Sequence, residues 1–459
     1  MLACAKENDT TSGLATQPLT VIVGMGDTGC ACARYLHGSV ARLAVMDSRE
    51  QPPGYHTLEA ELPDVSLYKG GFDLGVLSEA ACVVLSPGVA PDEPALESAR
   101  SRGVPIIGDI EIFARAAQAP VLAITGSNGK STVTSLLAKM GRACGYMVWS
   151  GGNLGPPALD LLAKPVPDFY LLELSSFQLE TTVSLEPAVA TVLNLSPDHL
   201  DRHAGIEHYS ELKQRIFRGP GAMVLNQDDS RVWAMARTGR QTTGFTLGEP
   251  FGGSFGLRFR DDSRWLSYGQ EYLIAEADLA VFGDHNLANA LAALAMGTAA
   301  GFPMGGMLDA LRRFRGLPHR CQLISEHQGV RWYNDSKATN VAAAVAALRG
   351  MQRGGKVVLI AGGEAKETDF SSLADAVAER ARSVVLFGRD AEKIAVAIGG
   401  RAPTHVVADM QQAVAAAHAV AQAGDSVLLS PACASFGLFA DYTARGECFV
   451  SAVHEVTAA

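Results

Sequence analysis

The sequence lacks several features that mark common classes of protein. Its eight cysteines form no CxxC pair and show no regular spacing, so we expect reduced, mostly buried thiols in a cytosolic protein. Its 38 Lys and Arg residues are outnumbered by 48 Asp and Glu, giving a formal net charge of -10. That balance excludes the basic face of a nucleic-acid-binding protein, but it allows a local basic pocket for an anionic small molecule.

Long apolar runs are missing as well. The first 20 residues contain no apolar core of signal-peptide length. The richest apolar helical pattern, 287–300, contains Asn289 and falls short of the ~20 residues that span a bilayer. We therefore expect a cytoplasmic protein without membrane insertion. Cys30 and Cys32 fall on a helical pattern without further ligands and do not indicate a metal site.

Strand-like and helix-like patterns alternate along all 459 residues, a length at which a chain divides into several domains. The alternation predicts an α/β protein with mainly parallel sheets. Three sections follow one another, with boundaries predicted near Asp109 and Leu317. The stretch 240–280 is rich in Gly, Asp and aromatic residues, and we expect it to form a small β insertion.

The segment TGSNGKST (125–132) lies between an apolar strand pattern and a Leu-rich helical pattern. Consecutive backbone N–H groups from Gly126 to Thr132 can surround phosphate oxygens, assisted by the helix dipole. Lys130 would then reach the β- and γ-phosphates, and the hydroxyl of Ser131 or Thr132 would bind Mg²⁺. The loop is shorter than GxxxxGK[ST], so we interpret it as a variant P-loop.

A glycine loop follows the first strand pattern, LTVIV. Gly24, Gly26 and Gly29 have the spacing of a dinucleotide-binding turn, and Asp47 ends the next strand pattern. However, Asp27 places a carboxylate where the backbone should approach a pyrophosphate, and no dehydrogenase constellation follows. The pattern therefore favours a phosphate-bearing ligand over NAD. A turn needed only for packing is the remaining alternative.

Acidic residues and histidines follow later strand patterns. Glu173 ends the apolar segment FYLLE, where an ionised carboxylate is costly unless it is paired or bound to a metal. Beside a P-loop it would be a natural Mg²⁺ ligand, and an exposed position at the strand end is the alternative. In SPDHLDRH (196–203), His199 and His203 could form a zinc pair, but Asp198, Asp201 and the neighbouring P-loop fit Mg²⁺ better.

Two further residues have plain interpretations when each is taken alone. His199 is interpreted as a structural histidine, and Lys213 as a surface helix lysine paired with Glu211 or Glu207.

Taken together, the motifs resemble the Mur ligase family along essentially the whole chain, in the family's order. The P-loop and the DHLDRH segment are typical of the whole family, whereas DSKATN and SPACAS favour its D-glutamate-adding member. The segments that carry the resemblance are TGSNGKST (125–132), GGNLG (151–155), LELSSFQLE (172–180), SPDHLDRH (196–203), GDHNLANALAA (283–293), GLPHRCQ (316–322), NDSKATN (334–340), IAGGEAKETDF (360–370) and SPACASFG (430–437).

The resemblance implies three domains: a Rossmann-like UDP-binding domain (1–108), a central P-loop ATPase domain (109–316) and a mobile, Rossmann-like, amino-acid-binding domain (317–459). It implies an ATP-dependent amide ligase that adds D-glutamate to UDP-N-acetylmuramoyl-L-alanine through an acyl phosphate, giving ADP and phosphate. Such an enzyme works in peptidoglycan precursor synthesis in a bacterial cytoplasm, without a nucleic-acid partner, and we expect a monomer.

The resemblance also assigns residues to substrates. The UDP-linked substrate would lie among Asp27, Thr28, Asp47, Ser48, Arg49, Gly88, Asn153 and His199. ATP would contact Gly126, Ser127, Asn128, Gly129, Lys130, Ser131, Thr132, Asn286, Asn289, Arg320 and Asp335. D-glutamate would be held by Lys337, Thr339, Lys366, Ser435 and Tyr442, where the family leads us to expect Phe at the last position.

The catalytic residues implied by the resemblance are Lys130, Glu173, His199, Lys213 and His319. Two Mg²⁺ ions are implied, one held by Ser131 and Glu173 and a second by His199 and Lys213. Lys213 would act as a carbamate formed with CO₂, which turns an uncharged amine into a carboxylate-like anion.

Three alternatives stay open at this point. The first is another amide ligase of the same superfamily, adding L-alanine or extending folylpolyglutamate. The second is a dehydrogenase, and the third is a nucleotide-sugar sensor that uses ATP only as a switch.

Overall fold

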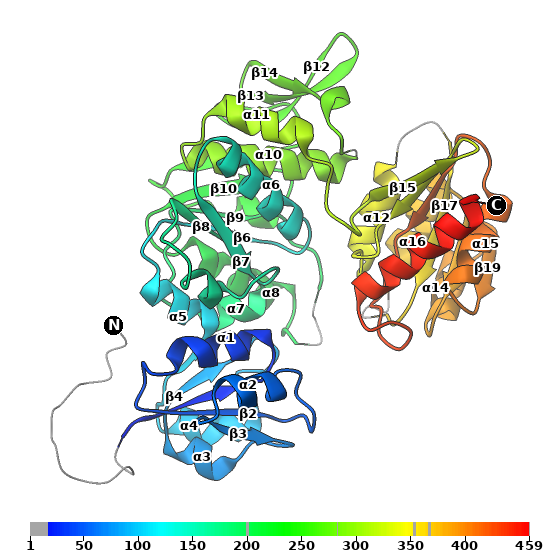
Figure 1. Ribbon diagram of the computed structural model, residues 1–459. Helices are drawn as coiled ribbons and strands as arrows, with labels where there is room; N and C mark the ends of the chain where they lie inside the picture. The colour runs from blue at the N-terminus through cyan, green and yellow to red at the C-terminus, as the bar shows by residue number, and fades with distance from the viewer. Residues whose placement is uncertain (1–16, 199–201, 282, 352–354, 366–368, 459) are drawn as a thin grey trace.

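The computed structural model describes residues 17–198, 202–281, 283–351, 355–365 and 369–458. Three sheets, each in its own body, follow one another along the chain. In Figure 1 the N-terminal body lies at the bottom, the central body above it and the C-terminal body on the right. No described helix is both long and apolar enough to cross a membrane.

The N-terminal body is a five-stranded parallel sheet flanked by helices. Its elements are β1 (Leu19–Val23), α1 (Asp27–Leu36), β2 (Arg42–Asp47), α2 (Tyr55–Glu61), β3 (Ser66–Lys69), α3 (Leu74–Glu79), β4 (Ala80–Leu85), the 3-10 helix η2 (Pro94–Leu96), α4 (Glu97–Ser101) and β5 (Ile106–Gly108). The strand order is β3-β2-β1-β4-β5, and every pair is parallel. The order reverses beside β1, the position at which ligands bind in open α/β sheets.

The central body contains a nine-stranded sheet. Its elements are α5 (Asp109–Ala116), β6 (Val121–Thr125), α6 (Lys130–Ala143), β7 (Val148–Gly152), η3 (Ala158–Leu161), β8 (Phe169–Glu173), α7 (Ser176–Glu180), β9 (Val189–Val192), α8 (Ile206–Gln214), η4 (Arg215–Phe217), β10 (Ala222–Asn226), α9 (Ser230–Trp233), β11 (Thr242–Phe245), β12 (Phe255–Arg260), β13 (Ser263–Tyr268), β14 (Glu271–Ala275), η5 (Glu276–Asp278), α10 (Asp284–Ala299) and α11 (Met304–Arg313). The strand order is β14-β13-β12-β11-β10-β9-β6-β8-β7.

The stretch 240–280 forms strands as expected. Its strands extend the central sheet first through β11, which is parallel to β10, and β12, which is parallel to β11. The next two pairs, β12–β13 and β13–β14, are antiparallel. Figure 1 shows these last strands at the far end of the central body from the N-terminal body.

The C-terminal body has a six-stranded sheet with helices on both faces. Its elements are β15 (Gln322–His327), β16 (Val330–Asn334), α12 (Val341–Gly350), β17 (Val357–Gly362), α13 (Ser371–Arg380), β18 (Ala381–Phe387), α14 (Ala391–Ile398), β19 (Thr404–Val407), α15 (Met410–Val420), β20 (Ser426–Leu429) and α16 (Tyr442–Ala458). The order is β15-β16-β20-β17-β18-β19, antiparallel only between β15 and β16. The predicted α/β class with mainly parallel sheets is confirmed.

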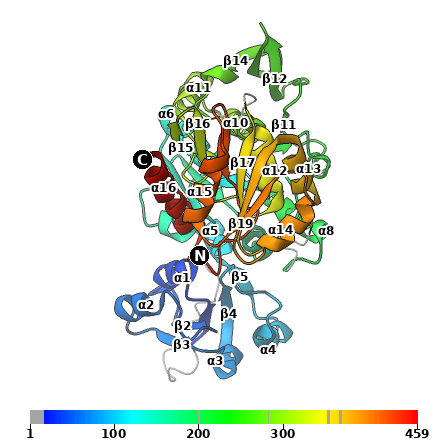
Figure 2. The ribbon, with the colours of Figure 1, turned by 90° about the vertical axis from the view of Figure 1, so that its right-hand side faces the viewer.

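Helix α5 lies between the first two sheets (Figure 2), and buried polar contacts hold it to the rest of the central body. Glu111 is 1% exposed and accepts hydrogen bonds from the backbone N–H groups of Val183 (2.6 Å) and Ser184 (2.8 Å). Asp109 Oδ2 accepts a hydrogen bond from Gln178 Nε2 (3.1 Å). Because these buried carboxylates are paired with donors on a neighbouring segment, they orient α5 instead of disrupting the packing.

Close packing of β1 on α1 requires a glycine at position 29. A Cβ built on Gly29 would lie 1.8 Å from the carbonyl oxygen of Gly24, far inside contact distance. At Gly26, which starts the same helix with φ -91°, a Cβ would meet no atom within 4 Å. The sequence motif thus contains one glycine that the packing demands and one that it does not.

We predict that Gly29→Ala lowers the free energy of unfolding by about 1–3 kcal/mol, because the helix must move away from the strand. Gly26→Ala, the matched control, should change it by no more than about 0.5 kcal/mol. Denaturant unfolding of both variants measures the difference. Equal losses in the two variants would contradict this account.

Candidate active site

The predicted P-loop joins β6 to α6, as the sequence indicates. Gly126 (φ 147°) and Gly129 (φ 86°) take conformations that favour glycine, and α6 begins at Lys130. Lys130 Nζ donates to the carbonyl oxygens of Gly126 (2.8 Å) and Ser127 (2.9 Å). Burial lowers the pKa of Lys130, while Glu173 and Asp198 oppose that shift. A phosphate arriving at α6 would therefore meet the start of a helix and an amine folded over the loop.

Asn194 holds the P-loop from the neighbouring strand end. Its Oδ1 accepts from the backbone N–H of Asn128 (2.8 Å), and its Nδ2 donates to the carbonyl of the same residue (3.0 Å). Ser127 Oγ donates to the carbonyl of Ser196 (3.0 Å) and lies 3.3 Å from the hydroxyl of Tyr209. No sequence motif assigns a role to Asn194 or Tyr209, although Asn194 lies beside the SPDHLDRH segment.

Glu173 ends β8 next to β6, where it is paired in register with Ile124. The side chain is 2% exposed, so the alternative of an exposed glutamate at the strand end is wrong. Its Oε1 accepts a hydrogen bond from Asn153 Nδ2 (2.9 Å), whereas its Oε2 is buried without a hydrogen-bond partner among the described residues. A buried carboxylate oxygen that lacks a donor is suited to a cation, so Glu173 fits the role of a Mg²⁺ ligand.

Lys213 lies on α8 and is 1% exposed. The interpretation as a surface lysine paired with Glu207 or Glu211 is therefore wrong, and Glu207 lies 3.9 Å from Arg231 instead. Lys213 Nζ donates to Thr125 Oγ1 (3.1 Å) and to the carbonyl of Gly126 (3.0 Å). Burial, and then the charge of Lys130, hold the pKa of Lys213 well below its usual range.

The burial of Lys213 has a weak signal in the sequence. Tyr209 and Leu212 are buried on the same helix, and Lys213 lies four residues after Tyr209, on the same face. The Nζ atom of Lys213 lies 4.5 Å from the centre of the Tyr209 ring. A lysine that continues an apolar helix face is a candidate for a buried amine.

A pocket opens between the central and C-terminal bodies, beside the P-loop. Its lining includes seven residues predicted to contact ATP, together with Lys337, which was predicted to hold D-glutamate. The seven are Asn128, Gly129, Thr132, Asn286, Asn289, Arg320 and Asp335, whereas Gly126, Ser127, Lys130 and Ser131 of the predicted set lie outside this lining. The structure therefore brings these seven residues to one place. It also adds His285, whose pKa is lowered by burial to about 4, so that its ring is neutral.

Arg320 connects the two bodies directly. Its Nη2 donates to Ser131 Oγ on the P-loop helix (2.9 Å). The next residue, Cys321, donates its backbone N–H to Asp335 Oδ1 (3.1 Å), and Ser430 Oγ donates to Asp335 Oδ2 (2.8 Å). Burial raises the pKa of Asp335 to about 7, against the opposing effects of these donors and of Arg320.

The residues predicted to hold D-glutamate gather partly around α16. Lys337 Nζ lies 3.5 Å from the ring centre of Tyr442, where the family leads us to expect Phe, so the cation rests on an aromatic face in either case. Ser435 is buried, and Thr339 is half-buried with its N–H bonded to the carbonyl of Lys337 (2.9 Å). Outside the lining described for the pocket lie Thr339, Ser435, Tyr442 and His319. Lys366 lies outside the described residues.

His319 takes a left-handed backbone conformation (φ 59°). Asn334 Nδ2 lies 3.0 Å from His319 Nδ1, while Asn334 Oδ1 accepts the backbone N–H of Ser336 (3.1 Å). Since the amide nitrogen can only donate, Nδ1 is the acceptor and the neutral ring carries its proton on Nε2. Burial lowers the pKa of His319, which favours this neutral form.

Arg445, which the sequence analysis missed, braces the C-terminal loops. It is fully buried on α16 and donates to Ser336 Oγ (3.0 Å), the carbonyl of Ser336 (2.7 Å) and the carbonyl of Cys433 (3.0 Å). No motif in the sequence singles out this arginine, because its role depends on two loops that are distant along the chain.

Most residues predicted to contact the UDP-linked substrate lie at or after the carboxyl ends of β1, β2 and β4, whereas Asn153 follows β7 in the central body. Asp47 is 3% exposed, and its oxygens accept from the N–H of Met25 (2.7 Å) and from Arg49 Nε (2.8 Å) and Nη2 (2.7 Å). Burial alone would raise the pKa of Asp47, but these donors hold it below its ordinary value. Asp47 is thus already paired, whereas Arg49 is half exposed and Asp27, Ser48 and Gly88 are exposed.

The remaining predicted ligands differ in their surroundings. His203 Nε2 lies 3.0 Å from Ser176 Oγ, and its ring stacks on Phe177, so this histidine has structural contacts of its own. His199, its partner in the considered zinc pair and a predicted ligand of Mg²⁺ and of the UDP-linked substrate, lies outside the described residues, as does Asp201. Thr28 is half-buried at the start of α1.

The raised pKa of Asp335 leads to a prediction about pH. The carboxyl group of Asp335 holds its proton more tightly in the folded state than in the unfolded state. Its contribution to the free energy of unfolding is therefore most favourable near pH 4 and is lost as pH rises towards 7. Asp335→Asn removes the charge and keeps the size. At pH 8 we expect this variant to unfold at a higher Tm than the parent, with a free energy of unfolding that is larger by ~2–4 kcal/mol. At pH 5 the difference in Tm between variant and parent should be smaller. Thermal unfolding at both pH values measures this, and an advantage that does not change with pH would contradict it.

Models of Mur ligase domains match three parts of the chain. They are described as the Mur ligase MurD-like N-terminal domain (residues 18–108), the Mur ligase middle domain (124–297) and the Mur ligase glutamate ligase domain (319–433). The three matches follow the order of the three sheets.

Relatives of high identity cover nearly the whole chain. A protein of Nitrosococcus oceani named UDP-N-acetylmuramoylalanine--D-glutamate ligase is 53% identical over 437 residues, covering 95% of this chain and 96% of that protein. One of the same name from Pseudomonas putida is 48% identical over 441 residues, covering 96% and 98%.

Solved structures of lower identity share the fold. The MurF ligase of Thermotoga maritima, solved in complex with ADP, has a TM-score of 0.61 at 16% identity and covers 97% of this chain and 99% of its own. The UDP-N-acetylmuramate-alanine ligase MurC of Thermotoga maritima has a TM-score of 0.60 at 17% identity, covering 96% and 100%. The identities, the coverage and the order of the matched domains agree, and the chain belongs to the Mur ligase family.

Proposed function

We propose that this chain is an ATP-dependent amide ligase that adds D-glutamate to UDP-N-acetylmuramoyl-L-alanine, in peptidoglycan precursor synthesis in the bacterial cytoplasm. The observation that carries the proposal is the pocket in which P-loop residues meet Arg320, Asp335 and Lys337 of the C-terminal body. A nucleotide in this pocket would lie between two bodies, with its phosphates at the start of α6. The relatives bear the name of an enzyme with this pair of substrates.

Each body has one proposed task. We assign the UDP-linked substrate to 1–108, ATP to 109–316 and the amino acid to 317–459. The carboxyl ends of β1, β2 and β4 offer backbone N–H groups and Arg49 to an anionic diphosphate. Lys337 and Ser435 suit a dicarboxylate, and Lys366 is proposed to join them.

Magnesium is proposed to bind beside the P-loop. Its proposed ligands are Ser131, Glu173, His199 and Lys213 as a carbamate. The described residues fit a cation, because Glu173 Oε2 is buried without a donor among them. Burial holds the pKa of Lys213 well below its usual range, which favours the uncharged form of the amine that reacts with CO₂. When bound, Mg²⁺ supplies positive charge that stabilises the transferring phosphoryl group.

The chain's own residues are proposed to act in two steps. First, the alanyl carboxylate attacks the γ-phosphorus of ATP and ADP leaves, while Lys130 neutralises charge on the phosphates. Then the amine of D-glutamate attacks the acyl carbon, loses a proton, and the tetrahedral intermediate expels phosphate. His319, with its proton on Nε2, is proposed to donate a hydrogen bond near the reacting groups.

Phosphate release tests the function. We expect release from ATP and Mg²⁺ only when UDP-N-acetylmuramoyl-L-alanine and D-glutamate are both present, with a product of matching mass. L-glutamate, L-alanine and meso-diaminopimelate serve as matched amino-acid controls. Release with another amino acid would contradict the assignment of the C-terminal pocket. ATP binding without any turnover would contradict the ligase and favour a sensor.

The carbamate has its own test. With ¹³C-labelled bicarbonate, the active protein should show a carbamate carbonyl resonance that disappears in Lys213→Met. This apolar side chain suits a buried site, so the variant should fold, yet its turnover should fall by roughly 10²-fold or more, since a charged ligand is lost. Thermal unfolding serves as the folding control. Full activity of Lys213→Met, or an active parent without the resonance, would contradict the proposal.

A further inference from the structure

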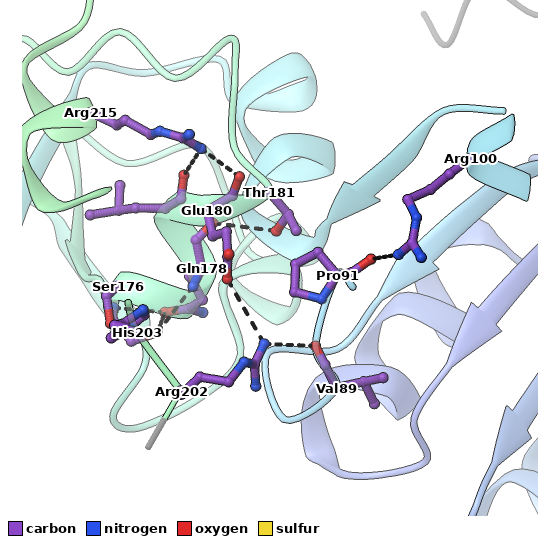
Figure 3. Close-up of polar contacts among 12 residues, drawn as sticks. Val89, Pro91, Arg100, Ser176, Gln178, Glu180, Thr181, Arg202, His203 and Arg215 are labelled. Carbon is purple, nitrogen blue, oxygen red and sulfur yellow. Dashed lines mark hydrogen bonds and ion pairs between the residues drawn. The ribbon is translucent and has the colours of Figure 1, made fainter. Parts of the chain in front are cut away.

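Arg202 lies at the border of the N-terminal and central bodies and contacts both (Figure 3). Its Nη2 donates to the carbonyl of Val89 in the N-terminal body (3.1 Å) and lies 3.8 Å from Glu180 Oε2 in the central body. Its guanidinium also lies 4.9 Å from the centre of the Phe177 ring. The side chain is 22% exposed, so this arginine is largely enclosed by its three partners.

Val89 belongs to a short loop, residues 86–91, that follows β4. Within it the N–H of Val89 bonds to the carbonyl of Ser86 (2.9 Å), which closes a tight turn around Gly88. Ser86 Oγ donates to the carbonyl of Gly24 (3.3 Å), the first glycine of the loop after β1. At the far end, Arg100 Nη1 donates to the carbonyl of Pro91. The loop is thus tied to the glycine loop at one end and to α4 at the other.

The contact through Arg202 differs from the other two because it comes from another body. Ser86 and Arg100 hold the loop within its own sheet, and neither relates it to the ATP site. Arg202 follows the SPDHLD segment, and Phe177 and Glu180 lie on α7, which begins three residues after Glu173. A displacement of the 86–91 loop relative to the P-loop must therefore break the bond from Arg202 to Val89.

We propose that Arg202 is a positioning residue for the UDP-linked substrate. It fixes the loop containing Gly88 against the central body, so that a ligand bound after β1 and β4 presents its reacting carboxylate at the P-loop. This inference rests on the proposed function, since it assigns the UDP-linked substrate to that loop. Arg202 acts on the loop through a backbone carbonyl and touches neither the pocket nor the P-loop residues described above.

The chemistry of the contact explains why arginine is suited here. A guanidinium donates to a carbonyl, faces a carboxylate and lies against an aromatic ring at the same time, because it is planar and has several N–H groups. A lysine could donate to the carbonyl but would lose the planar contact with Phe177. Glu180 lies 3.8 Å away and is partly exposed, so its ion pair contributes less than the hydrogen bond to Val89.

The test compares Arg202→Met and Arg202→Lys with Arg215→Met. Arg215 lies in the same cluster and donates to the carbonyls of Leu179 and Glu180, both outside the 86–91 loop (Figure 3). Steady-state kinetics give the KM for each substrate and kcat. Hydrogen–deuterium exchange of peptides covering 86–91, measured without ligands, reports on the loop itself.

We expect Arg202→Met to raise the KM for UDP-N-acetylmuramoyl-L-alanine about tenfold and to leave the KM for ATP within about twofold, as expected for loss of one charge-assisted hydrogen bond. Arg202→Lys should show a smaller increase of about threefold, since it keeps a donor. Exchange in 86–91 should accelerate in Arg202→Met and stay unchanged in Arg215→Met.

Two results would overturn the inference while the proposed function stands. The first is a parent that turns over normally with an Arg202→Met variant whose two KM values rise equally or not at all. The second is unchanged exchange in 86–91. If the parent shows no turnover with its substrates, the proposed function fails, and the assignment of the UDP-linked substrate to this loop fails with it.

Discussion

The burial of charged side chains at the ends of β6 and β8 is the constraint on which the rest of the molecule depends. Glu173 ends β8, Lys130 follows β6, and Lys213 reaches the end of β6 from α8 through hydrogen bonds to Thr125 and Gly126. Lys213 and Glu173 are almost completely buried. An ion removed from water costs several kcal/mol unless partners replace its hydration. Backbone carbonyls accept hydrogen bonds from the two amines. One oxygen of Glu173, in contrast, has no hydrogen-bond donor among the described residues. The large central sheet supports an arrangement that, in the proposed function, phosphate and metal complete.

Because parallel strands end at one edge of a sheet, segments that are distant in the sequence meet there. The C-terminal body contributes further residues to the pocket beside the P-loop. Arg320 reaches Ser131, and Asp335 is held in the pocket with a pKa raised by burial. Ionised Asp335 therefore lowers the free energy of unfolding of the nucleotide-free protein at neutral pH. We infer that the residues of the nucleotide site make the free protein less stable. The same reasoning applies to Lys213, because burial holds the pKa of its amine well below the usual range.

Local patterns in the sequence predict the local structure well. The strand, loop and helix from 121 to 143 follow from an apolar run, two glycines with positive φ and a helical pattern, all within one segment. The apolar pattern of β8 already favoured a paired or metal-bound Glu173 over an exposed one. The burial of Lys213 had only a weak local signal, because it depends on the packing of α8 against the P-loop. Arg445 was missed because its partners lie on two remote loops. The resemblance to a family supplied what spacing could not, namely a reason for a lysine near a cation.

The most direct test of the central claim is the affinity for ADP measured with and without Mg²⁺, in the parent and in Glu173→Gln, by calorimetry. If the unpaired oxygen of Glu173 serves a cation beside the P-loop, Mg²⁺ should strengthen ADP binding in the parent. It should have little effect in the variant, which keeps the size of the side chain and loses its charge. An equal strengthening by Mg²⁺ in both proteins would contradict the claim, since the buried carboxylate would then have no part in holding the metal.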